Sequence, residues 1–398
     1  MTYSIKPSTI SKAFFLTYIV YNYILIYSIY VFKGFSALLI IFALLFQLIA
    51  NKFRLQINKS IVFYFVFLIY ILASGFIVSV DKDRMLQTSF SYFEYLLIFY
   101  LVIAYSKDDK KVDFPINVFV FHGLIAAVVM VLRGVGIAGI RARIADNVNS
   151  NITAITLSFS IAFILYEIIE HKKTPIRITI SISAILFILF SLLMTVSKKG
   201  IISGIAFIVL WLICCYKSTF KHIKLIYKVI LVVAVIGLSI FSIIWFRSNY
   251  ASQIEYIQFR MSQISTSMSS RERVQLFKEG IVVFIDHPIL GVGFNNVRYF
   301  TSYNTYTHCF YSELLSATGI VGTMIFICPI IFTWNKIIRY FKNLNKDNNF
   351  VSVKCLYMII IFVLLMVISI TQIIFYIYNL MFVLAILSGF AIELSHNK

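Results

Sequence analysis

The chain is 398 residues long, and 61% of its residues are hydrophobic whereas 13% are charged. Because a typical soluble domain has about a quarter of its residues charged, this composition excludes a protein that folds mainly in water. The formal net charge of +19 fits the basic bias of membrane loops and attraction to anionic lipid headgroups. No nucleic-acid-binding motif is interleaved with the basic residues, so we expect no nucleic-acid partner.

Apolar runs of about 18 or more residues recur along the whole chain, and each can cross the hydrocarbon core of a bilayer as a helix. Hydropathy windows predict about twelve transmembrane helices, and no cleavage-site pattern marks the first of them as a removable signal. They lie at residues 14–32, 35–50, 61–80, 88–105, 114–132, 152–169, 178–196, 201–216, 229–246, 319–334, 356–374 and 376–394. We therefore expect an all-α, polytopic membrane helix bundle.

The distribution of Lys and Arg predicts the orientation of this bundle. With the N-terminus inside, the short loops on that side carry more basic residues than the short loops on the other side, as the positive-inside rule requires. We expect a multi-pass protein of the cytoplasmic (inner) membrane with both termini in the cytoplasm. The expected division is transmembrane helices 1–9 at residues 1–246, one long outer loop at 247–318, and transmembrane helices 10–12 at 319–398.

Several basic residues remain in the short outer loops, although the topological rule disfavours them there. Arg141 and Arg143 lie in a polar loop, Arg84 lies in another, and Lys198 and Lys199 separate two spans. Binding of a phosphate group is the most direct reason for such residues. For each residue alone, a solvated charge or a charge that faces lipid phosphates is the alternative.

Nothing in the sequence calls for a metal or another cofactor. The cysteines lack metal-ligand spacing, and only Cys309 lies in an outer loop, which also argues against a disulfide framework. The stretch Asp81-Lys82-Asp83 matches the Asp-x-Asp metal motif of some membrane glycosyltransferases, but the match is short. We expect no metal there.

The long outer loop is too long for a plain connector, since loops beyond about 15 residues are usually functional or disordered. Apolar residues at helical spacing predict an amphipathic helix over residues 271–286, on the membrane or on the bundle. His287-Pro288 ends this helix, because proline disfavours helical geometry in the residue before it. The apolar residues are Val274, Phe277, Ile281, Phe284 and Ile285.

A glycine-rich turn at residues 291–296 follows, and then a Tyr-rich stretch that contains Arg298. A second helix is expected to begin near Thr307, which can cap it, and to end at Gly319. His308 would lie in its first turn, where an imidazole, a helix N-terminus and nearby arginines suit an anionic substrate. The alternative for His308 is a structural histidine that caps a loop helix.

Three patches of the sequence resemble the O-antigen ligase and Wzy-type polysaccharide polymerase superfamily. Residues 271–296, with the core Pro-Ile-Leu-Gly-Val-Gly-Phe-Asn-Asn, are similar to the family's PxLGxGxxNF stretch. Residues 308–323 resemble its pattern of His, a polar residue, nine residues, Gly, two residues and Gly. Residues 195–204 resemble its Ser-(Arg/Lys)-(Arg/Lys)-Gly patch. Cys309 departs from the usual Asn, Ser or Gln, and Lys198 and Lys199 stand where many members have arginine.

The resemblance implies a GT-C-like bundle and a glycosyltransferase independent of nucleotide sugars, metals and other cofactors. Such enzymes move a glycan from undecaprenyl pyrophosphate to a sugar hydroxyl at the outer leaflet. The implied partners are an undecaprenyl-pyrophosphate-linked glycan, membrane lipid and a chain-length regulator protein. The implied catalytic residue is His308. The implied pyrophosphate- and glycan-binding residues are Arg141, Arg143, Lys198, Lys199, Arg271, Arg273 and Arg298.

Within the superfamily we favour a polymerase of O-antigen, capsule or exopolysaccharide, because the run Gly-Phe-Asn-Asn-Val-Arg followed by Thr-Tyr-Thr-His looks closest to such polymerases. An O-antigen ligase that transfers glycan to lipid A core is the alternative. A polytopic transporter or lipid-linked glycan flippase is the alternative from another class. Transporters usually show paired halves and charged residues within spans, and this sequence shows neither pattern clearly.

Overall fold

The structure is a computed structural model that describes residues 6–27, 33–134, 149–170, 174–215, 268–344 and 349–396. Every regular element in these ranges is a helix, which confirms the predicted all-α fold. The α-helices are α1 (Pro7–Tyr27), α2 (Lys33–Ala50), α3 (Lys59–Val78), α4 (Lys82–Asp108), α5 (Asp113–Gly134), α6 (Ser150–Glu170), α7 (Pro175–Met194), α8 (Lys198–Cys214), α12 (Met268–Asp286), α13 (Phe310–Asn343), α14 (Asn349–Ser369) and α15 (Tyr378–His396), and the 3-10 helices are η1 (Val297–Phe300) and η2 (Ile374–Tyr376).

Eight of the described helices are long and apolar enough to cross a membrane, namely α3 to α7 and α13 to α15. All eight overlap predicted spans, so the chain is a multi-pass helical membrane protein, as expected. The predicted spans at 14–32 and 201–216 fall on α1 and α8, and the span at 35–50 falls on α2, a shorter apolar helix. The predicted span at 229–246 lies outside the described residues.

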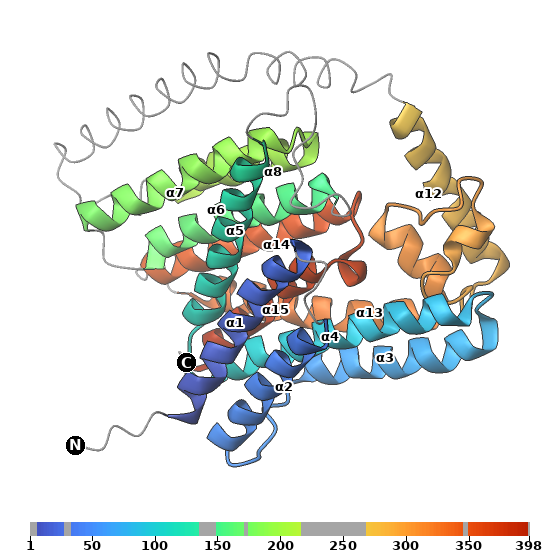
Figure 1. Ribbon diagram of the computed structural model, residues 1–398, viewed down its shortest axis with the longest axis horizontal. Helices are drawn as coiled ribbons and strands as arrows, with labels where there is room; N and C mark the ends of the chain where they lie inside the picture. The colour runs from blue at the N-terminus through green and yellow to red at the C-terminus, as the bar shows by residue number, and fades with distance from the viewer. Residues whose placement is uncertain are drawn as a thin grey trace.

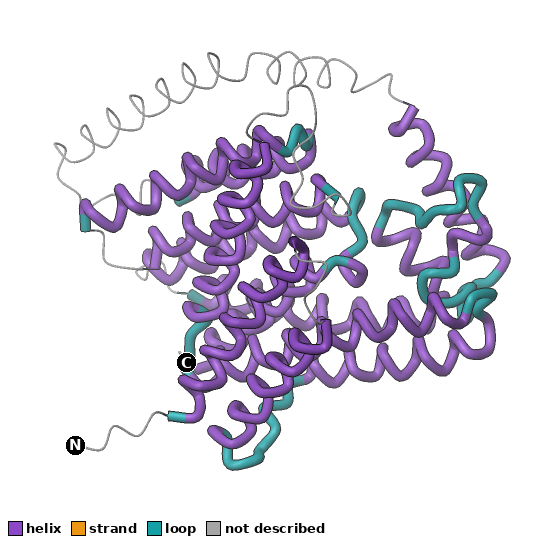
Figure 2. Tube along the Cα trace, viewed as in Figure 1, coloured by secondary structure: helices purple, strands orange, loops and turns teal. Residues whose placement is uncertain are grey.

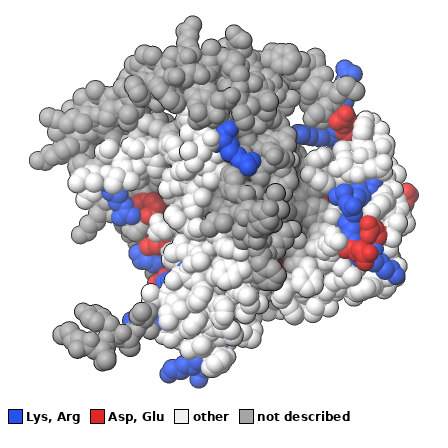
Figure 3. Space-filling model, in the orientation of Figure 1, with Lys and Arg blue, Asp and Glu red and all other residues white. Residues whose placement is uncertain are grey.

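The helices are arranged so that the loop segments that follow α12 lie at one end of the bundle. Figure 1 shows α3, α4 and α13 side by side, with α12 at their right-hand end, whereas α15 ends at the left. The loops around α12 are drawn in teal at the right of Figure 2. On the face drawn in Figure 3, the acidic side chains and many of the basic ones lie toward the left and right ends, and the described surface between them is mostly uncharged apart from basic side chains at the top centre and the bottom. This pattern is the one expected of helices that cross a bilayer.

A buried ion cluster joins three helices at the end of the bundle where α15 stops. Lys354 of α14 lies 2.8 Å from a carboxylate oxygen of Glu170 on α6 and 2.5 Å from one of Glu393 on α15. A second oxygen of Glu393 accepts the N–H of Val112, just before α5, at 3.0 Å. Because buried charges are tolerated when they are paired, this cluster fixes how α6, α14 and α15 pack.

Polar caps set where two helices begin at the opposite end. Asp81 caps α4 by accepting the N–H of Arg84 at 2.9 Å. Ser197 caps α8 by accepting the N–H of Gly200 at 3.4 Å, and its hydroxyl donates to Asn151 of α6 at 2.9 Å. Such caps satisfy N–H groups that the helix leaves free. The second cap places Lys198 and Lys199 in the first turn of α8.

The structure confirms a helix at the predicted position in the long loop and tells which of its sides packs on the bundle. Leu276, Gly280 and Val283 of α12 are buried, whereas Val274 and Phe277, from the predicted apolar set, are 57% and 43% exposed. The helix is apolar on two opposite sides, and the side with the glycine packs against α13 because it allows the closer approach. The predicted apolar face therefore does not lie on the bundle.

Three predicted helix boundaries close to the candidate site differ from the observed ones. The loop helix expected from Thr307 starts instead at Phe310, and it continues past a kink at Gly319 as part of α13. The span expected at 356–374 ends at Ser369, and the span expected from 376 begins at Tyr378. The mostly apolar residues between these two helices form an irregular segment with the short η2. In this segment the carbonyl of Thr371 accepts from Lys199, and the hydroxyl of Tyr376 contacts Asn295 and Glu313.

Candidate functional site

The kink at Gly319 joins α13 to the glycine-rich turn. Gly319 has φ 62° and ψ −169°, so α13 bends there. The carbonyls of Ser316 and Ala317 accept the N–H groups of Val292 and Gly293, each at 3.0 Å. These backbone hydrogen bonds tie the predicted Gly-Val-Gly turn to the helix that follows His308.

Glycine is required where these two segments touch. Gly291 has φ 69°, and a Cβ atom there would lie 2.5 Å from the carbonyl carbon of Ala317. A Cβ atom at Gly319 would lie 2.2 Å from the carbonyl oxygen of Ile289. Both contacts are with backbone atoms, which cannot move aside as a side chain can. The glycines of the two sequence motifs therefore hold one shared structure.

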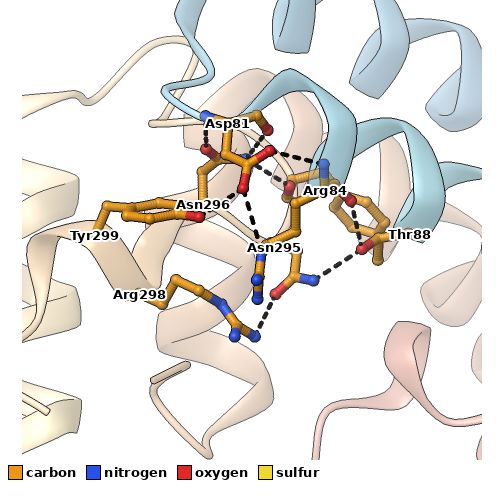
Figure 4. Close-up of polar contacts among 8 residues, drawn as sticks. Asp81, Arg84, Thr88, Asn295, Asn296, Arg298 and Tyr299 are labelled. Carbon is orange, nitrogen blue, oxygen red and sulfur yellow. Dashed lines mark hydrogen bonds and ion pairs between the residues drawn. The ribbon is translucent and has the colours of Figure 1, made fainter. Parts of the chain in front are cut away.

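Two asparagines dock the turn onto α4 (Figure 4). Asn296 is fully buried, and its amide oxygen accepts the N–H of Asp81 at 2.7 Å while its amide nitrogen donates to the Asp81 carbonyl at 3.1 Å. The Asn295 amide nitrogen donates to Thr88 at 2.8 Å. The Asn295 amide oxygen accepts from the guanidinium of Arg298 at 2.8 Å. The asparagines thereby place Arg298 beside α4.

Asp81, from the short Asp-x-Asp match, has a structural role in the same contact (Figure 4). Its carboxylate accepts the hydroxyl of Tyr299 at 2.6 Å as well as the N–H of Arg84. The Tyr299 hydroxyl, followed by the Arg84 N–H, lowers the pKa of Asp81 from its ordinary value. The carboxylate is thus used to cap α4 and to hold the loop.

His308 lies just before α13 and not in its first turn as predicted. It has φ 58°, and the helix is capped at Cys309. Thr307 does not cap the helix, because its hydroxyl donates to the carbonyl of Cys309 at 3.0 Å in a local turn. The imidazole packs against the ring of Tyr306, with ring centroids 4.2 Å apart and the ring planes inclined by 56°.

The positive charges of Lys199 on α8 and Arg273 on α12 both influence the imidazole of His308. Burial, then the charge of Arg273, then that of Lys199, lower the pKa of His308 to about 4. The ammonium of Lys199 also donates to the carbonyl of Thr371 at 2.8 Å. Two other predicted site residues, Lys199 and Arg273, which are distant from His308 in the sequence, therefore lie close enough to influence its imidazole electrostatically.

The other predicted binding residues have different positions. Arg298 and Arg273 both act electrostatically on Tyr306. Within the described residues the Nε atom of Arg298 is buried without a hydrogen-bond partner. Arg271 is exposed near the start of α12, and Lys198 is half-buried beside Lys199. The last two predicted residues, Arg141 and Arg143, lie outside the described residues.

Two residues that the sequence did not single out connect these parts. Glu313 is fully buried in the first turn of α13, and its carboxylate accepts the N–H of Thr307 at 2.8 Å and the hydroxyl of Tyr376 at 3.2 Å. Tyr376 in turn accepts the N–H of Asn295 at 2.8 Å. Glu313 thus fixes the turn that carries His308 relative to the turn that carries Arg298. A single acidic residue inside an apolar run was the available signal.

A cavity of about 370 Å³ opens beside Arg298. Amide, hydroxyl and guanidinium groups together with aromatic rings suit a ligand with many hydroxyl groups, such as a sugar. The residues that line the cavity include Thr88, Tyr95, Asn295, Arg298, Tyr306, Gln372 and Tyr376.

The fold and the site together define a multi-pass helical membrane protein with a cationic, histidine-containing site at one end of its bundle. Residues 182–327 match the family model described as O-Antigen ligase, and this range includes Lys199, Arg273, Arg298 and His308. The predicted resemblance to the O-antigen ligase and Wzy-type polymerase superfamily is thereby confirmed, and the match supports a glycan-transferring function of this general type. No curated protein matches the chain.

The low pKa of His308 predicts a particular pH dependence. If transfer needs the neutral imidazole and the charged ammonium of Lys199, kcat/KM should fall as the pH drops through about 4. It should also fall as the pH rises through about 7, because burial, followed by the charge of Arg273, lowers the pKa of Lys199 to about 7. Arg273→Gln removes a cation that opposes protonation of His308, so the pKa of His308 should rise toward the ordinary 6.5 and the acid limb should move to higher pH. The measurement is the pH profile of kcat/KM, with Lys278→Gln, an exposed cation on the same helix, as the control. An unmoved limb in Arg273→Gln would contradict the prediction.

Proposed function

We propose that this chain polymerises oligosaccharide repeat units of a surface polysaccharide, taking each from an undecaprenyl-pyrophosphate donor at the outer leaflet of the cytoplasmic membrane. The observation that carries the proposal is that His308 lies within electrostatic reach of Lys199 and Arg273 and packs against Tyr306, which lines the polar cavity. A general base and two cations are the groups that glycan transfer from a diphosphate needs.

In the proposed reaction the bond between the sugar C1 atom and the diphosphate oxygen breaks. A new bond forms between that C1 atom and a hydroxyl oxygen of the acceptor glycan, and the hydroxyl proton passes to His308, whose neutral form can accept it. Lys199 and Arg273 neutralise the charge that develops on the leaving diphosphate. Arg298 and the amides of the cavity orient the sugars.

The proposal requires that the site face outward and that both chain ends lie in the cytoplasm. The excess of Lys and Arg in the loops on the side of the termini supports this orientation. The ends of α1 and α15 that are nearest to the chain termini lie away from α12 in Figure 1, which agrees with it.

The test uses the purified full chain in nanodiscs with an undecaprenyl-pyrophosphate-linked repeat unit. We expect a ladder of lipid-linked products with several repeats, release of undecaprenyl pyrophosphate, and no requirement for a nucleotide sugar. Transfer only onto added lipid A core would replace the proposal with a ligase. Movement of the intact donor across the bilayer without a new glycosidic bond would replace it with a flippase.

A further inference from the structure

An apolar groove runs between α13 and α14. Its volume is about 330 Å³, and the residues of α14 on its wall remain accessible, with Val363, Val367 and Ile370 at 44%, 52% and 54% exposure. Both helices are long enough to cross a membrane, so the groove faces lipid. Its lining residues are Tyr311, Trp334, Phe362, Val363, Met366, Val367 and Ile370.

The two ends of the groove are fixed by side-chain contacts. At one end the ring of Trp334 packs on that of Phe362, with centroids 5.1 Å apart. At the other end the hydroxyl of Tyr311 donates to the carbonyl of Met366 at 3.0 Å and lies 3.2 Å from the hydroxyl of Ser369. The groove is therefore built between fixed walls, with Tyr311 near its polar end.

The polar end of the groove adjoins the cationic cluster. Tyr311 follows His308 by three residues, and Ile370, at the end of the groove, is the neighbour of Thr371, whose carbonyl accepts from Lys199. The next residue, Gln372, lines the polar cavity. Along this short segment the chain thus borders an apolar groove, a cation and a sugar-sized polar cavity in that order.

We propose that the groove binds the isoprenoid chain of the lipid-linked donor while its diphosphate lies at Lys199 and Arg273 and its first sugars enter the polar cavity. The inference rests on the proposed function and adds the path of the lipid. The order of the three surfaces matches the order of the three parts of such a molecule. A phospholipid has the chain and the phosphate but no glycan that could fill the cavity beside Arg298.

The groove should orient the donor more than it increases affinity. A chain that leaves the bilayer for the groove exchanges lipid contacts for equally apolar side chains, so the gain comes from packing and not from removal of water. We therefore expect moderate effects of groove variants on the donor KM, at about five- to tenfold.

The first test is photo-crosslinking of the wild-type chain in nanodiscs with a glycosylated undecaprenyl pyrophosphate that carries a diazirine in the isoprenoid chain. We expect labelling of residues 362–370 and of Trp334, and little labelling by a phospholipid with a diazirine in its acyl chain. Equal labelling by the phospholipid, or labelling concentrated on α3, would overturn the proposal.

The second test fills the groove with a larger side chain. Val363→Trp should reduce the crosslink and raise the KM of the long-chain donor about five- to tenfold, with little effect on a donor that has only two isoprene units. Val66→Trp is the matched control, because Val66 on α3 is 43% exposed and Val363 is 44% exposed. If the ratio of the KM values for the long and the short donor were the same in Val363→Trp as in the wild type, the proposed binding of the isoprenoid chain in the groove would be refuted.

The two proposals fail in different ways. Specific labelling of the groove without transfer from any donor would leave the lipid site in place and remove the proposed function. Polymer formation with labelling spread over the lipid-facing helices would keep the function and remove the groove.

Discussion

Replacing His308 with alanine is expected to reduce glycan transfer by about 10²- to 10⁴-fold, the usual contribution of general acid–base catalysis. Burial and the charges of Arg273 and Lys199 lower the pKa of His308 to about 4, so the imidazole is neutral at physiological pH. The charge of a bound diphosphate would offset the two cations and thereby favour transfer of the hydroxyl proton to the imidazole. The folded state should persist, since the side chain is only partly buried and lies outside the helices. The measurements are initial rates with the purified chain and the polymer formed in a complemented null strain.

His287→Ala is the matched control for this prediction. His287 belongs to the same loop and also contacts an aromatic ring, that of Phe300 with centroids 5.7 Å apart, but it is exposed. The transfer rate of His287→Ala should remain within about twofold of the wild-type rate, because surface substitutions away from special features have small effects. If His308→Ala retained a third or more of the wild-type rate, the residue would have no part in the chemistry.

Most helices could be predicted from the sequence because an apolar segment in lipid can adopt few backbone structures. Each apolar run in lipid must satisfy its own backbone groups, and the windows that predict α5 and α6 reflect only that requirement. The glycine-rich turn was also predictable, since the local sequence Gly-Val-Gly favours positive φ, and the turn has it at Gly291 and Gly293.

The contacts that assemble the site could not be predicted in the same way, because their partners are distant in sequence. Tyr376 contacts Glu313 and Asn295 from an irregular segment. The residues of this segment are so apolar that their sequence predicts a transmembrane helix. The buried side of α12 was ambiguous for a related reason. The helix has two apolar sides, and only the partner surface at Thr307 and Ser312 determines that the side with Gly280 packs inward.

Replacing Glu313 is expected to displace the turn that carries His308, although Glu313 itself takes no part in the chemistry. Glu313→Ala leaves the buried N–H of Thr307 and the hydroxyl of Tyr376 without an acceptor, and each unsatisfied donor costs about 1–3 kcal/mol. The turn that carries His308 should then shift, and a displacement of about 1 Å can lower a rate by about 100-fold. We therefore expect a loss of transfer of at least about that size, together with a lower melting temperature in detergent.

Glu313→Gln separates positioning from simple loss of folding. Glutamine keeps one oxygen acceptor and turns the other into an N–H donor, so only one of the two hydrogen bonds is lost. We expect a folded protein with kcat reduced about tenfold, the equivalent of one such bond, and a smaller change in KM. Glu279→Gln is the control, because Glu279 also accepts a loop N–H, that of Ser302 at 3.0 Å, but lies far less buried on α12.

A double-mutant cycle identifies the connection through Tyr376. Glu313 accepts the hydroxyl of Tyr376 at 3.2 Å. If Glu313 acts through this hydrogen bond, Tyr376→Phe should lower kcat by a factor similar to that of Glu313→Gln. The double variant should then be little worse than either single variant. Effects that multiply in the double variant would mean that the two side chains act independently. His308 would then depend on Glu313 only through the N–H of Thr307, and the turn that carries Arg298 would be held by separate contacts.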